Sequence, residues 1–335
     1  MKLGILGPRG LVGEELLKLL ETKKWANDVT LISTQTKVKG SVRFKGKTLA
    51  LHSLDRIIKK KTHFDLVLSL AEPAWAKGNL KKVFSLTKFL VDESSAFRLN
   101  PDVPLIIPEI NGNSLSGVPP KLIASPNCTT SVLAMAIYPV SRLSPLKRVI
   151  VASYQAASGG GRAAKDAFLK ETKYFATHGI PPKKSEVFPQ PLVGNVFPYI
   201  GELNASGFTE EEDKVIRETR KILGTLDLEI SATCVRVPVV RSHSLAIWIE
   251  TEKSLSLENL RQIYKKSPGI ILKEPYPTPQ DASGKLQVFV GRLRNDPVFI
   301  NGISLWASGD NLIKGAALNV LQIAELLLPR GLLRN

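Results

Sequence analysis

The sequence predicts an α/β protein in which an N-terminal doubly wound sheet is followed by a mixed α+β domain. Strand and helix patterns alternate up to about residue 127, β-rich segments dominate to about residue 310, and an amphipathic helical segment closes the chain. Strands that alternate with helices are typical of a parallel sheet built from βαβ units. We therefore expect a first domain over residues 1–127, joined by about 311–335, and a second over residues 128–310.

The first domain is predicted from short apolar runs separated by helical periodicity. Runs with the length of buried strands lie at 2–6, 29–33, 64–70, 89–92 and 121–124. Leucines recur at near-helical spacing over residues 13–22, which predicts a helix between the first two strands.

The second domain is predicted from β-rich segments with helices among them. The expected strands cover 149–155, 228–240, 243–251 and 286–293, and the expected helices cover 163–178 and 209–223. Thr209 is a predicted N-cap, acidic residues fill the next turn, and Gly224 follows the end. The proline-rich stretch 181–191 predicts an ordered loop, and residues 311–328 predict a long helix that packs back on the first domain.

Composition narrows the class of protein. The chain has 335 residues, enough for two domains with their own cores. No apolar run approaches the roughly 18 residues of a membrane span, and the N-terminus resembles a strand rather than a signal peptide. Only two cysteines are present, which excludes a disulfide framework and a CxxC-type zinc site. We expect a cytoplasmic protein with no metal site and no membrane partner.

The net charge of +16 raises the question of a nucleic-acid partner. The basic residues are spread along the chain, apart from a cluster at 59–61, and no aromatic side chains are interleaved with them. This pattern favours a solvated basic surface, so we expect no nucleic-acid partner. A field that attracts an anionic substrate and cofactor is the alternative function of this charge.

A glycine-rich turn follows the first predicted strand and opens the first helix in a GxxGxxG spacing. Glycines let the backbone approach a pyrophosphate, and the amides of a helix N-terminus favour anionic oxygens. Tight turns also use glycine for structural reasons, but this position favours a Rossmann-like dinucleotide site. The residues expected to line the turn are Gly7, Arg9, Gly10, Leu11, Val12 and Gly13.

The end of the second predicted strand bears on the choice of cofactor. An NAD enzyme usually places an acid there to bind the ribose diol, and this chain has none. Ser33, Thr36 and Lys37, with Lys39 nearby, suit a 2′-phosphate instead. We therefore predict NADP, while the alternative that these are ordinary polar loop residues stays open.

The sharpest chemical signal is the segment SPNCTT at residues 125–130. Its Cys128 follows a short strand and precedes an apolar helical run that we expect Pro139 to end. A helix start lowers a thiol pKa from its ordinary value of about 8.5 and supplies amides for an oxyanion. A lone cysteine is more often inert core, as we expect for Cys234, but this context makes Cys128 a candidate nucleophile.

A thiolate beside a nicotinamide site suggests one type of reaction. The thiolate adds to an aldehyde, a hydride leaves to the nicotinamide, and an acceptor cleaves the resulting thioester. Such chemistry needs a general acid or base within hydrogen-bond reach. Of the four histidines, three lie in basic or loop contexts, and His243 at the mouth of a strand is the best candidate.

Five separate stretches, in the right order, resemble the aspartate-semialdehyde dehydrogenase family nearly end to end. The segment around Cys128 resembles the family's nucleophile box, and YQAASG at 154–159 resembles its YQAxSG motif. CVRVPVVRSH at 234–243 is similar to CxRVPVxRGH, and DNLIKGAA at 310–317 is similar to the DNLRKGAA helix start. Residues 94–111 resemble the family's SSAFR…VPLVVPEVN stretch.

The resemblance implies catalytic roles for the matching residues. Cys128 attacks the carbonyl carbon, His243 serves as acid and base, and Gln155 orients the substrate or intermediate. Arg236 binds the substrate carboxylate, which suits a bidentate guanidinium. Ser242 stands where the family has glycine before the histidine.

The resemblance also implies substrate contacts outside these motifs. Glu211 binds the substrate amine, and Lys214, Arg98 and Asn127 bind phosphate. Glu211 and Lys214 share a face of the predicted helix at spacing i,i+3, so they can point into one pocket. A surface ion pair is the alternative for these two residues.

The resemblance also implies that Ser158, Gly159 and Asn311 contact the cofactor. The chain departs from the family's adenine-phosphate turn at Gln35, where an arginine belongs, and Arg9 partly replaces the missing charge. The choice between NADP and NAD therefore stays open at this stage.

The activity implied is the reversible NADPH-dependent reductive dephosphorylation of L-aspartyl-4-phosphate to the semialdehyde through a cysteine thioester. That step feeds lysine, diaminopimelate, threonine and methionine synthesis. A homodimer is also implied, with a tetramer left open. One alternative is an N-acetyl-glutamyl-phosphate reductase, whose nucleophile box has glycine where this chain has Asn127. The other is a non-catalytic paralogue that acts as a binding protein.

Overall fold

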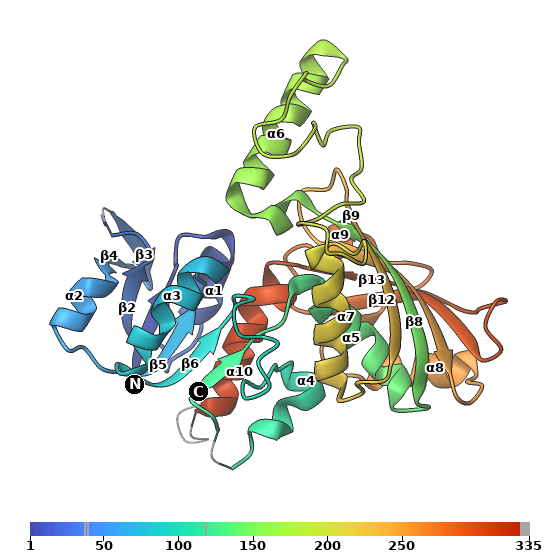
Figure 1. Ribbon diagram of the computed structural model, residues 1–335, viewed down its shortest axis with the longest axis horizontal. Helices are drawn as coiled ribbons and strands as arrows, with labels where there is room; N and C mark the ends of the chain where they lie inside the picture. The colour runs from blue at the N-terminus through green and yellow to red at the C-terminus, as the bar shows by residue number, and fades with distance from the viewer. Residues whose placement is uncertain (37, 39, 118, 329–335) are drawn as a thin grey trace. The chain divides into compact units, whose positions relative to one another are not determined.

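The computed structural model describes residues 1–36, 38, 40–117 and 119–328. These form two compact units, Met1–Asn127 with the segment from Ala316 onward, and Cys128–Gly315. Figure 1 shows the helices and strands of both units coloured along the chain. Each unit combines a sheet with helices, so the predicted α/β fold class is confirmed.

Within the described residues, the N-terminal unit is built on a seven-stranded sheet in the order β3-β4-β2-β1-β5-β6-β7. The strands are β1 (Lys2–Leu6), β2 (Asp28–Ser33), β3 (Ser41–Phe44), β4 (Lys47–Ser53), β5 (Phe64–Ser69), β6 (Thr87–Asp92) and β7 (Leu122–Ala124). The edge strand β3 pairs antiparallel with β4, and the other described pairings are parallel. The order runs outward in both directions from β1 and β5, which places a ligand crevice at their carboxyl ends.

Helices cover both faces of this sheet, which makes it a Rossmann-like doubly wound sheet. One face is covered by α1 (Leu11–Glu21) and α10 (Leu318–Leu327), and the other by α2 (Leu54–Lys59) and α3 (Pro73–Phe84). Leu16 and Leu321 are fully buried on the first face, as is Leu80 on the second. Burial of one such leucine side chain stabilises the folded state by roughly 1.5–3 kcal/mol. The buried apolar side of α10 therefore fixes that helix within this unit. Two short turns, α4 (Pro108–Asn111) and η1 (Gly112–Leu115), lead to β7.

The C-terminal unit, all of which is described, is built on a six-stranded mixed sheet in the order β11-β12-β13-β10-β8-β9. The strands are β8 (Leu146–Gln155), β9 (Glu229–Arg236), β10 (His243–Thr251), β11 (Ile270–Leu272), β12 (Val288–Asn295) and β13 (Gly302–Gly309). The register pairs Gln155 with Arg236 and Tyr154 with Ser244. Gln155, Arg236 and His243 therefore come together at one end of three neighbouring strands.

Helices lie on one face of this second sheet. They are α5 (Cys128–Ser141), α7 (Glu210–Leu223) and α8 (Leu257–Lys266), and α5 contacts both of the others together with four strands. The opposite face, which we call the open sheet face, carries the exposed side chains of Ile150 and Tyr154 and the half-buried side chains of Trp248 and Trp306. The rings of Tyr154 and Trp306 lie 5.2 Å apart there.

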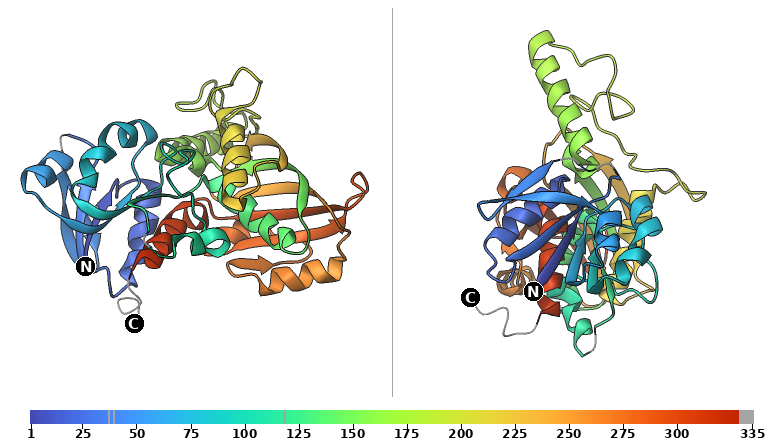
Figure 2. Two further views of the ribbon diagram at one scale, coloured as in Figure 1. Left: turned by 60° about the horizontal axis from the view of Figure 1, so that its bottom comes forward. Right: turned by 90° about the vertical axis from the view of Figure 1, so that its left-hand side faces the viewer.

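Helix α6 (Gly161–His178) follows the short turn η2 (Ala157–Gly160) and projects from its unit (Figures 1 and 2). The stretch 181–191 beyond it is a loop, as predicted. Glu171 of α6 holds this loop, because its Oε2 accepts a hydrogen bond of 2.7 Å from the Leu192 amide and its Oε1 accepts one from Ser185 Oγ. In the part of the chain that the structure describes, no helix has both the length and the apolar character to cross a membrane.

The predicted end of α5 at Pro139 is wrong. The helix runs on to Ser141 with Pro139 inside its last turn, although proline has no amide to donate to the carbonyl four residues before it. Tyr264 of α8 donates a hydrogen bond of 2.7 Å to the Ala136 carbonyl in the preceding turn. A buried hydroxyl therefore braces the helix next to the proline.

Two further predicted boundaries are wrong. The strand predicted over 228–240 ends at Arg236, two residues before Pro238, which cannot donate to a neighbouring strand. The helix predicted from residue 311 begins with a π-helical turn η3 (Ile313–Ala317), and α10 starts only at Leu318. The Asp310 carboxylate accepts hydrogen bonds from the Leu312 and Ile313 amides, so it caps this turn in place of an earlier helix.

Candidate active site

Cys128 and His243 form the centre of a candidate active site in the C-terminal unit. Cys128 begins α5 and is partly exposed, and its Sγ lies 3.4 Å from Nε2 of the fully buried His243. Apart from Cys128, Tyr138 and Ser141, every residue of α5 is buried. The sulfur is thus fixed at the N-terminus of a core helix, where the helix dipole favours a thiolate.

The tautomer of His243 follows from its second contact. The Ala156 amide donates a hydrogen bond of 3.1 Å to Nδ1, so this nitrogen holds a lone pair and the proton of the neutral ring is on Nε2. Burial and then the charge of Arg236 lower the pKa of His243 to about 3. The ring is therefore neutral near pH 7 and presents an N–H to the sulfur.

Two glycines allow this close packing. A Cβ on Gly159 would lie 2.8 Å from Nη1 of Arg236 and 3.0 Å from Nε2 of His243. A Cβ on Gly315 would lie 2.9 Å from the Cβ of Cys128. Gly315 was not among the predicted site residues, although it stands within the DNLIKGAA stretch, where a glycine inside a helix start indicates a close approach.

Opposite charges flank the sulfur. Arg236 is buried at the end of β9, and its Nη1 donates a hydrogen bond of 2.7 Å to the Ala156 carbonyl. Burial lowers the pKa of Arg236, while the charges of Glu211 and Cys128 act in the opposite sense. Glu211 lies in the first turn of α7, and its Oε1 accepts a hydrogen bond of 3.4 Å from the hydroxyl of Thr129, which follows Cys128 in the chain.

The structure separates the two residues that were expected to share a pocket on α7. Glu211 is buried against Thr129, whereas Nζ of Lys214 lies 3.7 Å from Oε2 of Glu210 and the side chain is partly exposed. The helix itself starts as predicted, with a capping box between Thr209 and Glu212. The phosphate role of Lys214 stays a prediction.

Gln155 and Cys234 lie near this centre in different environments. Gln155 is buried at the end of β8, where its Nε2 donates a hydrogen bond of 3.1 Å to Ser153 Oγ. Cys234 is 1% exposed, and burial raises the pKa of its thiol well above the ordinary range. The predicted position of Cys234 in the core is confirmed by this burial.

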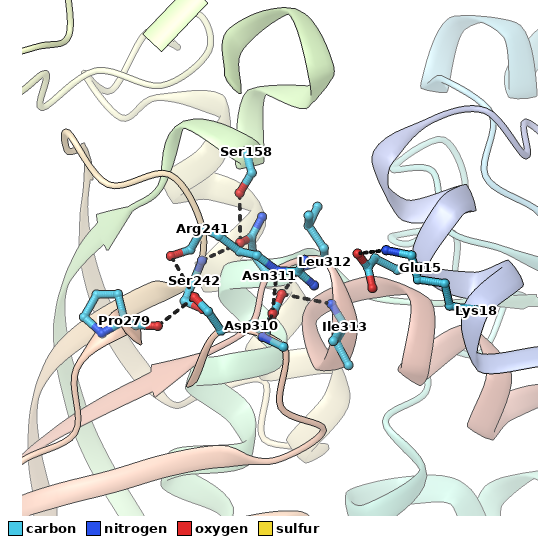
Figure 3. A network of polar contacts seen from close by, with 12 residues as sticks. Glu15, Lys18, Ser158, Arg241, Ser242, Pro279, Asp310, Asn311, Leu312 and Ile313 are labelled. Atoms are coloured by element: carbon cyan, nitrogen blue, oxygen red, sulfur yellow. Dashed lines mark hydrogen bonds and ion pairs between the residues drawn. The ribbon is translucent and has the colours of Figure 1, made fainter. Parts of the chain in front are cut away.

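Ser158 and Asn311, both predicted to bind the cofactor, contact each other. The Asn311 Oδ1 accepts hydrogen bonds from Ser158 Oγ at 3.1 Å and from the Ser242 amide at 2.9 Å (Figure 3). Both side chains are almost completely buried. Through the Ser242 amide, Asn311 contacts the residue that directly precedes His243 in the chain.

Two glycines of the turn in the N-terminal unit lie too close to neighbouring backbone to carry a side chain. Gly7 has φ +79°, and a Cβ there would lie 2.7 Å from the Leu70 carbonyl oxygen. A Cβ on Gly13 would lie 2.6 Å from the Pro8 carbonyl oxygen. Gly10 is the N-cap of α1, makes no side-chain cap and leaves the first-turn amides open to an anion. Leu11 and Val12 follow as the first residues of α1.

A cavity of about 270 Å³ lies beside this turn, at the carboxyl ends of β1, β2 and β5. Arg9 reaches the end of β2, where its Nη2 donates a hydrogen bond of 3.2 Å to Oε1 of Gln35. Ser33 is buried with its Oγ bonded to the Gln35 amide, and Thr36 is exposed. Lys37 lies outside the described residues. The lining residues are Gly7, Pro8, Arg9, Gly10, Ser33, Thr34, Gln35, Leu51, Leu70, Ala71 and Glu72.

Arg98 and Asn127, predicted to bind phosphate, are buried in the N-terminal unit. Nη2 of Arg98 donates to the Glu93 carbonyl and lies 3.7 Å from the Glu93 carboxylate. Asn127 directly precedes Cys128 in the chain. Their contacts with phosphate stay predictions.

Known proteins resemble the chain over its whole length. Residues 2–118 match the family model described as semialdehyde dehydrogenase, NAD binding domain, and residues 138–314 match the one described as semialdehyde dehydrogenase, dimerisation domain. An aspartate-semialdehyde dehydrogenase of Synechocystis sp. is 40% identical over 99% of this chain and 98% of its own. One of Aquifex aeolicus is 38% identical over 99% of both chains.

A solved structure agrees with these sequence matches. The aspartate semialdehyde dehydrogenase II of Vibrio cholerae, complexed with ASA, superimposes with a TM-score of 0.91 at 31% identity and covers 97% of both chains. The matches are end to end, and the motifs at 154–159 and 234–243 contain Ala156, Arg236 and His243 of the C-terminal unit. The chain therefore belongs to the aspartate-semialdehyde dehydrogenase family.

Proposed function

We propose that this protein is an oxidoreductase that interconverts L-aspartyl-4-phosphate and L-aspartate 4-semialdehyde with a nicotinamide dinucleotide. The observation that carries the proposal is the approach of Cys128 Sγ to His243 Nε2 at 3.4 Å. Arg236 and Glu211 flank this pair with opposite charges. An amino acid that carries a carboxylate and an ammonium group beside the reacting carbonyl is complementary to that arrangement.

The reductive direction can be written with the residues of this chain. Arg236 binds the α-carboxylate and Glu211 the α-ammonium group, which presents the acyl phosphate to the sulfur. The Cys128 thiolate attacks the carbonyl carbon, a C–S bond forms, and the C–O bond to phosphate breaks. The leaving phosphate takes up one proton from solvent and departs as inorganic phosphate. When bound, the nicotinamide supplies the hydride that reduces the resulting thioester. The hemithioacetal oxygen then reforms the carbonyl, and Cys128 leaves as a thiolate.

His243 acts in this sequence as a hydrogen-bond donor. The reaction regenerates the thiolate in each turnover, so the ring is not required to store the thiol proton. Its Nε2–H stabilises negative charge on the sulfur and on the developing oxyanion. To accept a proton at Nε2, the ring would have to carry its proton on Nδ1 and lose the Ala156 hydrogen bond. Of the two predicted roles of His243, acid and base, this geometry thus favours the acid, which donates from Nε2.

The glycine turn and its cavity fit a dinucleotide, because Gly10 opens α1 without a side-chain cap and the cavity lies directly beside it. NADP is the proposed form. Arg9 supports it, since its guanidinium is held by Gln35 at the end of β2, where the family's arginine is missing. A guanidinium in that place suits a 2′-phosphate better than a ribose diol.

A homodimer and a cytoplasmic location complete the proposal. The match to a dimerisation domain covers the strands of the open sheet face, whose aromatic side chains a second copy would cover. A nucleophilic thiol has to stay reduced to work, which favours the cytoplasm. The pathway assignment to lysine, diaminopimelate, threonine and methionine synthesis rests on the same activity.

The test is a phosphate-dependent assay with aspartate semialdehyde, run with NADP and NAD in parallel. Cys128→Ser should lower turnover by about 10³-fold, because it removes the covalent route. Cys234→Ser is the matched control and should keep most of the activity. Full turnover by Cys128→Ser would reject the mechanism, and a preference for N-acetylglutamate semialdehyde would favour the reductase alternative. Substrate binding without any turnover would favour the binding-protein alternative.

A further inference from the structure

We propose that Asn311 is a positioning residue for His243, which it holds by tying together the chain segments on its two sides. The inference rests on the proposed function only because it takes Cys128 and His243 as the reacting pair. It goes beyond the cofactor contact that the family resemblance implies for Asn311. The contacts that carry it lie within the C-terminal unit (Figure 3).

One oxygen atom makes both contacts. Asn311 Oδ1 accepts the Ser242 amide at 2.9 Å and the Ser158 hydroxyl at 3.1 Å. A backbone amide can only donate, so the atom that faces Ser242 has to be the carboxamide oxygen, with two lone pairs for two donors. Among the described residues no contact uses the Asn311 nitrogen, which stays compatible with a cofactor contact.

Each contact reaches a direct chain neighbour of the site. Ser242 precedes His243, which begins β10. Ser158 precedes Gly159, whose Cα lies against His243 and Arg236 so closely that a Cβ would collide with both. The carboxamide oxygen therefore fixes the imidazole from its own strand and from the segment that packs on it.

The Ser242 backbone needs this support. Its φ is +75°, in the left-handed region that glycine adopts freely and other residues adopt at a cost of about 1 kcal/mol or more. Two hydrogen bonds hold the Ser242 backbone in this conformation. One runs from the Ser242 amide to Asn311 Oδ1, and the other, of 2.9 Å, joins Ser242 Oγ and Ser283 Oγ. Ser283 is itself anchored, because its Oγ donates a hydrogen bond of 2.8 Å to the Pro279 carbonyl.

Asn311 is itself held by its neighbour Asp310. The Asp310 carboxylate is fully buried and accepts hydrogen bonds from Arg241 Nε at 2.7 Å and from the Gly284 amide at 2.6 Å. The same carboxylate caps the turn that leads to Gly315, which packs on Cys128. Asn311 thus extends from a rigid point and not from a free loop.

The experiment measures the thiol without cofactor or substrate. The full-length apoprotein is treated with iodoacetamide, and the alkylation rate of Cys128 is followed across pH; buried Cys234 does not contribute. Asn311→Ala should slow alkylation by roughly tenfold and lower kcat by a similar factor. Asn259→Ala, on the exposed surface of α8, is the matched control and should alkylate at the wild-type rate.

A second substitution tests the route through the backbone. Ser242→Gly removes the cost of the left-handed φ, so in the double variant with Asn311→Ala it should restore most of the alkylation rate. Should Asn311→Ala prove too unstable, Ser158→Ala removes one of the two bonds and should show a smaller loss in the same direction.

Two outcomes would overturn the inference. One is wild-type alkylation of Asn311→Ala with a raised KM for the cofactor, which would leave Asn311 with a cofactor contact alone. The other is slow alkylation that Ser242→Gly does not rescue. Neither outcome touches the proposed function, because that is decided by Cys128→Ser and the substrate assay.

Discussion

The Ala156 amide donates a hydrogen bond to Nδ1 of His243, and this contact decides which nitrogen of the ring carries the proton. The same residue accepts a hydrogen bond from Arg236 through its carbonyl oxygen. One peptide segment therefore orients the imidazole that faces the sulfur and the guanidinium proposed to bind the substrate. A residue whose side chain is a single methyl group organises two functional groups through its backbone.

Acid should destabilise this protein through His243. The pKa of its ring falls from 6.5 to about 3 on folding, so between these values the unfolded chain binds a proton that the folded chain does not. Stability therefore falls as the pH is lowered from 6.5, by about 1.4 kcal/mol per pH unit from this group. Urea unfolding at several pH values should show this slope, and His243→Gln should reduce it. The control His178→Gln, at the exposed end of α6, should keep it; an unchanged slope in His243→Gln would contradict the buried neutral ring.

Gly159→Ala should abolish most activity without unfolding the protein. The added Cβ would meet both Arg236 and His243, so the guanidinium and the imidazole have to move from their present positions beside the sulfur. We expect a loss of about 10²-fold in kcat/KM, because a displacement of 1 Å can cost that much. Gly78→Ala, in α3 with open space around its Cβ, is the control and should stabilise the fold by about 1 kcal/mol. Near-wild-type kcat/KM for Gly159→Ala would refute the packing argument.

Arg9→Ala should weaken the binding of NADPH more than the binding of NADH. A guanidinium that pairs with the 2′-phosphate contributes to one cofactor only, and the loss should raise the KM for NADPH by roughly tenfold. Gln35→Arg should act in the opposite direction, since it adds a second charge at the end of β2. The exposed Arg43→Ala of β3 controls for net charge. Equal changes for the two cofactors in Arg9→Ala would argue against a 2′-phosphate contact.

Ile150→Glu should separate the proposed homodimer. The side chain is 43% exposed on the open sheet face, opposite Trp248 on the neighbouring strand, and a charge there would be buried without a partner on association. Light scattering should report a monomer at concentrations where the wild type is a dimer. Leu226→Glu, at a residue that is 80% exposed between α7 and β9, should leave the dimer intact. A dimer that survives Ile150→Glu would place the interface elsewhere.

Local sequence patterns predicted much of this fold because local chemistry determines it. Strands β1 and β10 have the predicted bounds, since each is an apolar run between residues that end a strand. Thr209 as the N-cap and Gly224 after the last residue bound α7 as predicted. The glycine turn was also visible, because only glycine fits the φ of +79° at Gly7.

The parts that sequence reasoning missed depend on long-range register. The bond between Ala156 and His243 joins residues 87 positions apart, and it exists because β8 pairs with β10 in one register. The different neighbours of Glu211 and Lys214 depend on how α7 packs against α5. Neither follows from spacing along the chain. The replacement of glycine by Ser242 was visible, but its cost became clear only from the φ of +75°.

The sulfur of Cys128, the proposed nucleophile, stands on the first residue of a helix that is otherwise packed among two helices and four strands. Its position is therefore a property of the protein interior, and no surface loop can adjust it. Heat inactivation and loss of compact structure should follow the same curve, so whatever preserves the interior also preserves catalysis. Adaptation to other substrates would have to begin with the side chains around the sulfur, because the core helix fixes the position of the sulfur itself.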